Sequence, residues 1–237
     1  MPPDSNQPPP PDPTAIRRAT HTAHTTHTHI AGIPLPDSAL AKEATELIRD
    51  TTDELIYHHS RRVHLFGARH GRERGLAFDA ELLYVGALFH ALGLTDRFRA
   101  SRQRYELDGA DAAHRFLTAR GVAPDRARLA WEAVALHTTP EVPHRMAPEI
   151  ALLAAGFDLD VLGIGYATLP SEARDEILVA HPRPDFKRRI LRALHQGIAH
   201  RPETTLGTTG SDVLSRFDPD HIRPDFVRTV EDSAWPE

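Results

Sequence analysis

The sequence predicts an all-α protein: a single helical bundle over residues 37–237, preceded by a tail over residues 1–36. Apolar residues recur three or four positions apart in several segments, which places them on one face of a helix. The clearest case is residues 184–200, where Phe186, Ile190 and Leu194 are spaced by four. No stretch of useful length alternates apolar and polar residues as a half-buried strand would.

The first helices are predicted from their capping residues. Asp37 or Ser38 can accept a hydrogen bond from the first turn of one helix. Thr51 or Thr52 begins the next, which we expect to run to about Phe66. The third contains the most apolar run of the chain and is expected over residues 79–93, with an aspartate as its N-cap and a glycine as its stop.

The later helices are marked by proline and glycine. A short helix is expected over residues 111–120 and is stopped by Gly121. Pro124 suits the first turn of a helix that ends before Pro140, and Pro148 opens another. Further helices are expected over residues 184–200 and from about residue 224, with an irregular segment around residues 202–210.

The N-terminal segment, residues 1–36, is predicted to be a disordered tail because it is rich in proline and lacks helical periodicity. Its histidines alternate with threonine and alanine at His21, His24, His27 and His29. They could chelate a transition metal loosely, but we interpret the segment as a solvated polar linker.

The composition excludes several classes of protein. The formal net charge of −5 gives no basic face for nucleic acid. No apolar run reaches the roughly 18 residues that suggest a membrane span, and the N-terminus does not resemble a secretory signal. With no cysteine there can be no disulfide or thiolate metal site, and we expect a cytoplasmic protein. The 16 histidines are therefore the soft ligands available to a metal.

Two histidines on successive helices attract attention. His59 lies four residues after Leu55, on the apolar stripe of its helix, whereas the neighbouring His58 is rotated by about 100° toward the rim. His90 lies near the end of the most apolar run and must find a partner, because an unsatisfied buried polar group costs roughly 1–3 kcal/mol. Taken alone, a core-facing histidine is more often structural than a ligand.

Two more polar residues face inward on later helices. His137 follows Ala133 by four residues near a helix C-terminus, where the helix dipole favours its protonated form. It is a candidate acid, base or substrate donor, although a plain core histidine fits as well. Asp160 follows Leu153 by seven residues and needs a partner if it is buried, unless it caps a new helix. Asp158 is the less inward of the two aspartates.

Inward histidines and an inward aspartate on separate helices together suggest a metal site. Imidazole and carboxylate suit zinc, iron or manganese, and three protein ligands plus a water form the usual shell of catalytic zinc. The other histidines of the helical region are expected at the surface: His64, His70, His114, His144, His181, His195, His200 and His221.

Several motifs recur in the order found in a known family. Residues 59–67 read HSRRVHLFG and residues 90–95 read HALGLT, and further matches lie at residues 105–110, 136–140, 159–163, 202–205 and 233–237. Over residues 36–237 the chain thus resembles the HD-domain superfamily, and more closely its cyanamide hydratase-like branch. The family has a His-Asp pair where this chain has His90 and Ala91.

The resemblance implies a helical bundle around one divalent metal, most simply zinc. The implied ligands are His59, His90 and Asp160, with Ala91 at the position of the lost aspartate. The implied activity is hydration of a small nitrile-type carbon, as in cyanamide to urea, by a metal-bound water whose pKa is lowered toward about 7. We expect His137 to manage the proton given to the nitrile nitrogen.

Ala91 is the departure from the family, and it should weaken or abolish metal binding. Two explanations stay open at this point. The chain carries an inactivating Asp→Ala change of the kind used to trap a ligand, or the natural protein has drifted to an altered or lost activity. Because the other motifs are intact, the first explanation is favoured.

Two other functions are compatible with the sequence. A metal-dependent phosphohydrolase needs basic side chains at the metal, and the arginines at 61, 62, 69, 72 and 74 are available but are expected to face solvent mostly. A non-catalytic module would keep a small-molecule pocket without the chemistry. In each case the expected partner is a small molecule, with neither nucleic acid nor membrane, and a homo-oligomer is compatible with the sequence.

Overall fold

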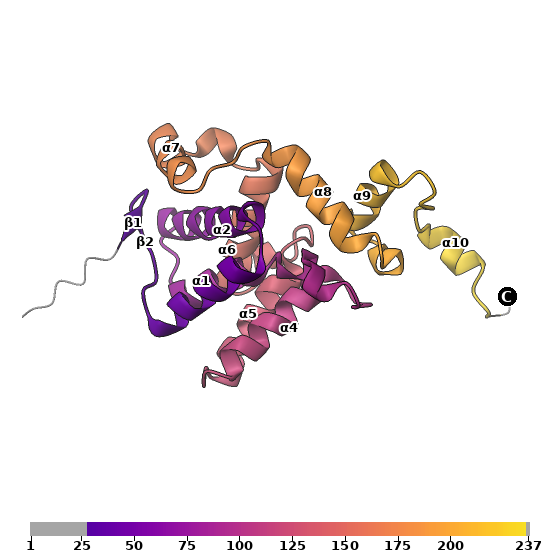
Figure 1. Cartoon of the computed structure of the whole chain (residues 1–237), viewed down its shortest axis with the longest axis horizontal. Coiled ribbons are helices and arrows are strands. Elements are labelled where there is room, and N and C mark those ends of the chain that lie inside the picture. The colour runs from indigo at the N-terminus through magenta and orange to yellow at the C-terminus, as the bar shows by residue number, and fades with distance from the viewer. Residues whose placement is uncertain (1–27, 236–237) are drawn as a thin grey trace, which may run out of the picture.

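The computed structural model describes residues 28–235, of which about 67% are helical, so the all-α prediction is confirmed. Figure 1 shows the order of the elements along the chain. The helices are α1 (Ala39–Thr51), α2 (Glu54–Glu73), α3 (Ala80–Phe89), α4 (Tyr105–Thr118), α5 (Pro124–Leu136), α6 (Pro148–Phe157), α7 (Ser171–Ala180), α8 (Phe186–Ile198), α9 (Thr209–Phe217) and α10 (Phe226–Glu231). Two-residue strands β1 (His29–Ile30) and β2 (Ile33–Pro34) form an antiparallel hairpin.

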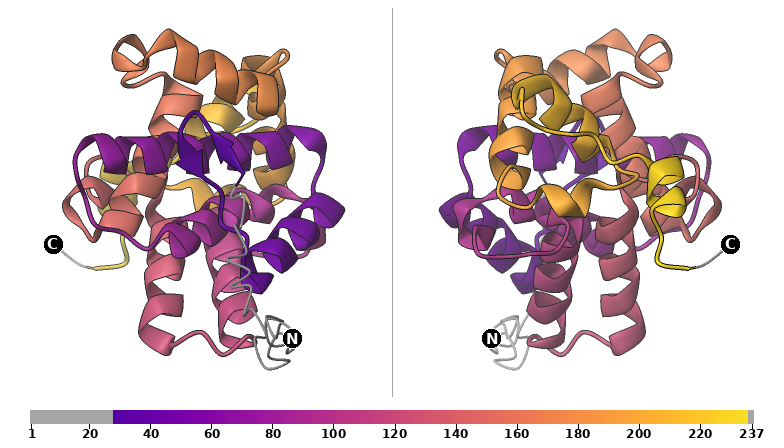
Figure 2. Two further views of the ribbon diagram at one scale, coloured as in Figure 1. Left: turned by 90° about the vertical axis from the view of Figure 1, so that its left-hand side faces the viewer. Right: turned by 90° about the vertical axis from the view of Figure 1, so that its right-hand side faces the viewer.

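The helices pack around a core formed by α2, α3, α5 and α6. In Figure 1, α4 and α5 lie side by side below this core, and α8 and α9 lie on one flank. Figure 2 shows the hairpin lying against α2, while α7 and the segment before it cover another side of the molecule. The short helix α10 projects from the body at the end opposite the hairpin (Figure 1).

Helices α2 and α6 approach each other closely because each has a glycine that faces the backbone of the other helix. A Cβ at Gly156 would lie 2.1 Å from the carbonyl oxygen of Val63, and one at Gly67 would lie 2.4 Å from that of Leu152. Neither separation is possible for a larger residue. This crossing sets the relative position of the two helices that lead to His59 and Asp160.

The observed helix starts agree with the capping residues expected from the sequence, with small shifts. Ser38 and Asp79 accept hydrogen bonds from the first turns of α1 and α3. Asp53, rather than a threonine, caps α2, which continues to Glu73 instead of ending near Phe66. Burial of α2 along most of its length explains why it continues beyond its amphipathic stripe.

Helix α3 ends earlier than expected. His90 is its C-cap, and a 3-10 turn, Leu92–Leu94, replaces the predicted continuation to Gly93. A Cβ at Gly93 would lie 2.0 Å from the carbonyl oxygen of Tyr105, so this glycine permits a close contact with the start of α4 rather than ending the helix. Correspondingly, α4 begins at Tyr105, ahead of the predicted start.

Two helices and one turn were not expected. Helix α7 has no counterpart among the predicted elements, and α9 forms just after the segment predicted to be irregular. A π-helical turn, Asp158–Leu162, extends α6 and ends at Gly163, whose φ of 74° is left-handed. This turn decides the direction of the Asp160 side chain.

The tail prediction is wrong for residues 28–36. Ile33 is buried in the main core, and the hairpin places Ala31 where its N–H donates to Glu176 of α7. Apolar contact and pairing therefore order this part of the chain. The remainder of the predicted tail, with His21, His24 and His27, lies outside the described residues.

Within residues 28–235, every helix is too short or too polar to cross a membrane.

Candidate functional site

The four candidate residues come together in the interior, from four different elements. His59 lies on α2, His90 and His137 are the C-caps of α3 and α5, and Asp160 lies in the π-helical turn after α6. Their exposed fractions are 1%, 0%, 2% and 1%, in the same order. Residues separated by up to 101 positions in the sequence thus form one buried polar cluster.

Asp160 is the hydrogen-bond acceptor of this cluster. The Nδ1–H of His59 donates to its Oδ2 over 2.7 Å. Burial alone would raise the pKa of Asp160, but the hydrogen bonds from His59 and Arg62 hold it well below its usual range. The side chain is therefore a carboxylate, and His59 must carry its proton on Nδ1.

Two arginines occupy the rest of that carboxylate. Arg62 donates from Nε and Nη2, each over 2.8 Å, and Arg183 donates from Nε over 3.1 Å. The expectation that the arginines of α2 face solvent is wrong for Arg61 and Arg62, which are both buried. The chain around residue 181 covers this side of α2, and Arg62 also donates to the carbonyl oxygens of His181 and Pro182.

His90 and His137 are held in the same way as each other. The Nδ1–H of His90 donates to the carbonyl oxygen of Ala87, and that of His137 to the carbonyl oxygen of Val134, each over 2.7 Å. These bonds are available because both histidines end a helix, where carbonyl groups lack intrahelical partners. Both rings therefore carry the proton on Nδ1 and leave Nε2 as a lone pair.

The Nε2 atoms of His59 and His90 face each other. They are 3.0 Å apart, and each ring has its Nδ1 proton committed to an oxygen. Two lone pairs in contact repel unless a cation, either a proton or a metal ion, lies between them. His137 stands edge-on to His90 with ring centroids 4.9 Å apart, and its Nε2 has no hydrogen-bond partner among residues 28–235.

Burial disfavours a charge on these rings. It is the largest cause that lowers the pKa of His59, and it lowers that of His90 well below the usual value. Burial also lowers the pKa of His137 to about 4, so the dipole effect expected at the helix end is overcome by desolvation.

The predicted ligand set was His59, His90 and Asp160, and the structure brings these residues together without directing them at one point. Asp160 contacts the Nδ1 edge of His59, whereas His90 contacts the Nε2 edge. Among the described residues, no group of three or more histidine, aspartate or glutamate side chains has an arrangement that could hold a metal ion. The ligand role of Asp160 stays a prediction.

As they stand, the Nε2 atoms of His59, His90 and His137 form no such group either, but the first two come close to the spacing of a ligand pair. Two imidazole ligands of a tetrahedral zinc ion are about 3.3 Å apart, given Zn–N bonds of about 2.0–2.1 Å. The observed separation of 3.0 Å between the first two atoms is a few tenths of an ångström smaller. In this arrangement Asp160 orients His59 from its far edge, the usual role of a carboxylate behind a metal-binding histidine.

Ala91 lies beside these rings. It is 2% exposed and lines a small cavity of ≈ 10 Å³ together with His59, His90 and His137. The apolar side chains of Leu94, Ile190, Val161 and Leu194 complete the walls with Tyr105 and Phe157. This space is enough for about one water molecule.

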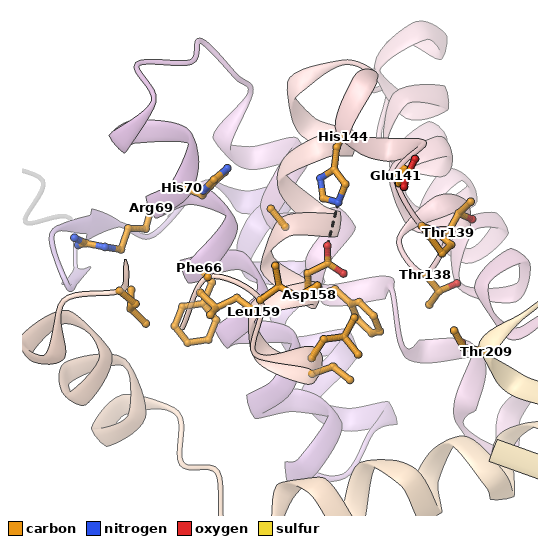
Figure 3. A pocket seen from close by; sticks show the side chains of 18 of the residues that line it. Phe66, Arg69, His70, Thr138, Thr139, Glu141, His144, Asp158, Leu159 and Thr209 are labelled. Carbon is orange, nitrogen blue, oxygen red and sulfur yellow. Dashed lines mark hydrogen bonds and ion pairs between the residues drawn. The ribbon is translucent and has the colours of Figure 1, made fainter. Parts of the chain in front are cut away.

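A much larger cavity adjoins the small one. Its volume is ≈ 660 Å³, and it shares Tyr105, Phe157, Val161 and Leu194 with the histidine cavity. Figure 3 shows the larger cavity from close by, with the hydrogen bond between His144 and Asp158 near its middle. Its size lies within the range of small-molecule sites, roughly 300–1,000 Å³.

The sequence interpretation missed part of the buried polar structure. His64 and His181 were expected at the surface but are buried, and neither ring nitrogen of His64 has a hydrogen-bond partner in the described part of the chain. Glu106, which accepts from Arg104 and Thr138, also lies close to His137. None of these three positions carries a periodicity signal, because the burial of each depends on which elements pack around it.

No protein-family model matches the chain, and no curated protein matches it in sequence. The HD-domain relationship therefore remains a resemblance based on the motifs.

Proposed function

We propose that the protein is a metal-dependent hydratase, a hydro-lyase that adds water to the carbon of a cyano or nitrile-type substrate. The observation that supports it best is the common arrangement of three buried imidazoles. His59, His90 and His137 each donate their Nδ1–H to an oxygen, and each lines one small cavity with its ring. Lone pairs fixed in this way suit a divalent cation such as zinc, with iron or manganese as alternatives.

The proposed roles of the residues follow from these contacts. The Nε2 atoms of His59 and His90 would hold the ion, and His137 would join them only after its ring moves, because the three side chains form no metal-binding group as they stand. When bound, such an ion lowers the pKa of a water molecule and so supplies a nucleophile at neutral pH. Asp160 fixes the tautomer and orientation of His59, and Arg62 holds Asp160 in turn.

A proton donor for the nitrile nitrogen is also available. Tyr105 lines both the small and the large cavity, and its ring lies 6.1 Å from that of His137, centroid to centroid. Burial raises the pKa of Tyr105 well above its usual value, so its hydroxyl stays protonated. We propose that this hydroxyl, rather than His137, donates a hydrogen bond to the substrate nitrogen, because the Nδ1–H of His137 is already bound to the carbonyl oxygen of Val134.

The charges near the site favour a neutral substrate over a phosphate. Arg62 and Arg183 are committed to Asp160. Arg69, the arginine among the residues lining the large cavity, pairs with Glu73 over 2.7 Å. A phosphohydrolase needs free cationic groups beside the metal, so this alternative has less support.

The test combines metal content with activity. Purified protein would be loaded with zinc, iron or manganese, dialysed, and analysed for bound metal, and urea release from cyanamide would be measured in parallel. We expect His59→Ala, His90→Ala and His137→Ala each to lower bound metal, and the neighbouring His58→Ala to leave it unchanged.

The outcomes separate the candidate functions. Metal binding with urea release supports the hydratase. Metal binding with phosphate-ester hydrolysis and no urea would support the phosphohydrolase instead. Protein that binds no metal, or binds it equally in His59→Ala and His58→Ala, would leave a binding module as the better description.

A further inference from the structure

A large cavity and a narrow one, which contains the histidine rings, lie next to each other with a shared wall. The large cavity of ≈ 660 Å³ and the small cavity of ≈ 10 Å³ share Tyr105, Phe157, Val161 and Leu194. Because these four side chains stand between the cavities, a ligand in the large cavity reaches the histidines, at the narrow end, only if they move aside. The small cavity has room for about one water, so a branched or ring group does not fit there.

We infer that the substrate is an organic nitrile with a neutral apolar body, and that the body occupies the large cavity while the cyano group alone enters the histidine cavity. This inference rests on the proposed function for the identity of the reactive group. A cyano group is linear and carries no substituent beside its axis, so it is among the narrowest carbon centres that water can attack.

The apolar walls of the large cavity are the reason for inferring that the body of the substrate is apolar. Phe66, Phe157, Leu159, Val161, Leu191 and Val213 contribute apolar side chains from α2, α6, the π-helical turn, α8 and α9. A molecule as small as cyanamide would leave most of this space to water. An apolar body would displace that water and gain contact with the walls.

The pairing of the polar groups around the large cavity is the reason for inferring that the substrate is uncharged. Arg69 is paired through Nη2 with Glu73 over 2.7 Å, while its buried Nε has no hydrogen-bond partner among the described residues. His144 contacts Asp158 over 3.0 Å, as Figure 3 shows. Burial lowers the pKa of His70, which keeps that ring neutral at pH 7. Glu141 is exposed to solvent at the edge. An anionic ligand would compete with Glu73 for Arg69 or with Asp158 for His144, whereas a neutral ligand leaves both pairs intact.

The narrow end is apolar as well. Ala91, Leu94 and Ile190 form the wall of the small cavity beside the histidines. In the metal-free protein, a neutral cyano carbon suits this wall, while a carboxylate or phosphate would face it without a compensating charge.

The test measures binding, so it does not depend on turnover. The affinity of full-length, chelator-treated protein would be measured by calorimetry for 4-phenylbutanenitrile, for 4-phenylbutanoate, for butylbenzene and for acetonitrile. We expect 4-phenylbutanenitrile to bind at least tenfold more tightly than each of the other three. Each comparison removes one feature: the neutral head group, the cyano group or the apolar body.

A pair of variants places the binding in the large cavity. Leu191 lines that cavity from α8 and is 41% exposed, so Leu191→Glu should leave the fold intact. It should weaken binding of 4-phenylbutanenitrile at least tenfold by placing a carboxylate in the apolar wall. Val179→Glu is the matched control, because Val179 is 83% exposed on α7 and lies outside the cavity.

Two results would overturn the inference: acetonitrile, butylbenzene or the carboxylate binding as tightly as the nitrile, or equal effects of Leu191→Glu and Val179→Glu. Tight, cavity-dependent binding of the nitrile supports it even if the metal-loaded protein releases no hydration product. That last result would count against the proposed hydratase alone.

Discussion

Arg62 and Asp160 form a bidentate ion pair in the interior, with two N–H···O bonds of 2.8 Å and 1% side-chain exposure on each partner. The pair connects α2 to the π-helical turn after α6. Arg62 lies about one helical turn after His59 on α2. Because Asp160 also accepts from His59, Arg62 fixes the carboxylate that orients a candidate ligand.

The first prediction concerns this pair. Arg62→Met removes the bidentate partner and leaves Asp160 with Arg183 and His59, so the free energy of unfolding should fall by about 3 kcal/mol in urea denaturation. Arg99→Met is the control, because Arg99 pairs with Asp96 at the surface and should change stability by less than about 1 kcal/mol. Equal losses from the two changes would contradict a structural role for the buried pair.

The sequence was sufficient for the fold class and for the buried positions of His59, His90, His137 and Asp160. Helix caps and apolar spacing predicted most of the helices, and the stripe on α2 correctly placed His59 toward the core and His58 away from it. The signal is strong there because one face of each helix is apolar and the opposite face is polar.

The sequence could not predict burial on the other faces of α2. The segment after α7 covers Arg62, and Tyr84 of α3 covers Arg61 and His64. Helical periodicity describes one buried face, whereas a helix enclosed by several neighbours buries polar residues whose partners are distant in sequence. For the same reason the partner of Asp160 could not be anticipated: it depends on the π-helical turn, which changes the direction of that side chain.

The second prediction tests the crossing of α2 and α6. Gly156→Ala places a Cβ 2.1 Å from the carbonyl oxygen of Val63, so the helices must separate and Asp160 must move relative to His59. We expect a loss of stability of more than about 2 kcal/mol, together with weaker metal binding. Gly86→Ala is the matched control on α3, where the nearest atom would be at 3.9 Å and stability should be unchanged or higher. Thermal melting of both variants checks this, and similar melting temperatures would show that the close approach is not required.

The third prediction concerns His64, whose two ring nitrogens are buried without hydrogen-bond partners in the described part of the chain. Removing an unsatisfied buried polar group while keeping most of the volume should stabilise the fold. His64→Leu should therefore raise the free energy of unfolding at pH 7 by about 1 kcal/mol. His114→Leu, at a half-buried position on α4, is the comparison and should give a smaller change. A clear loss of stability from His64→Leu would indicate that the ring has a partner in solution.

The fourth prediction is the pH dependence that follows from the same residue. Burial lowers the pKa of His64 to about 3, below the value of 6.5 expected for the unfolded chain. Between these values the unfolded state binds more protons than the folded state, so stability decreases as the pH falls from about 6.5. The His64→Leu variant lacks one such group. As the pH is lowered from 6.5 to 4, the free energy of unfolding of this variant should fall less steeply than that of the unsubstituted protein. Urea denaturation across this range measures both slopes, and parallel curves would contradict the prediction.

The last prediction concerns Ala91, which lines the small cavity with the three histidines. Ala91→Asp would add a carboxylate there, and neither Arg62 nor Arg183 is free to neutralise it, because both are bound to Asp160. Without metal, the buried charge should lower the free energy of unfolding by about 2–3 kcal/mol. Zinc should restore that loss, because the new carboxylate adds a ligand and offsets the charge of the ion.

Ala91→Asn supplies the control for size, since it places a side chain of the same shape and no charge in the cavity. Melting temperatures with chelator and with zinc, bound metal and nitrile hydration would be measured for both variants. Ala91→Asp should show a larger zinc-dependent rise in melting temperature, more bound metal and faster hydration than Ala91→Asn. If the two variants respond to zinc alike, the position does not belong to a metal site. The small cavity would then act only as the closed end of a binding pocket.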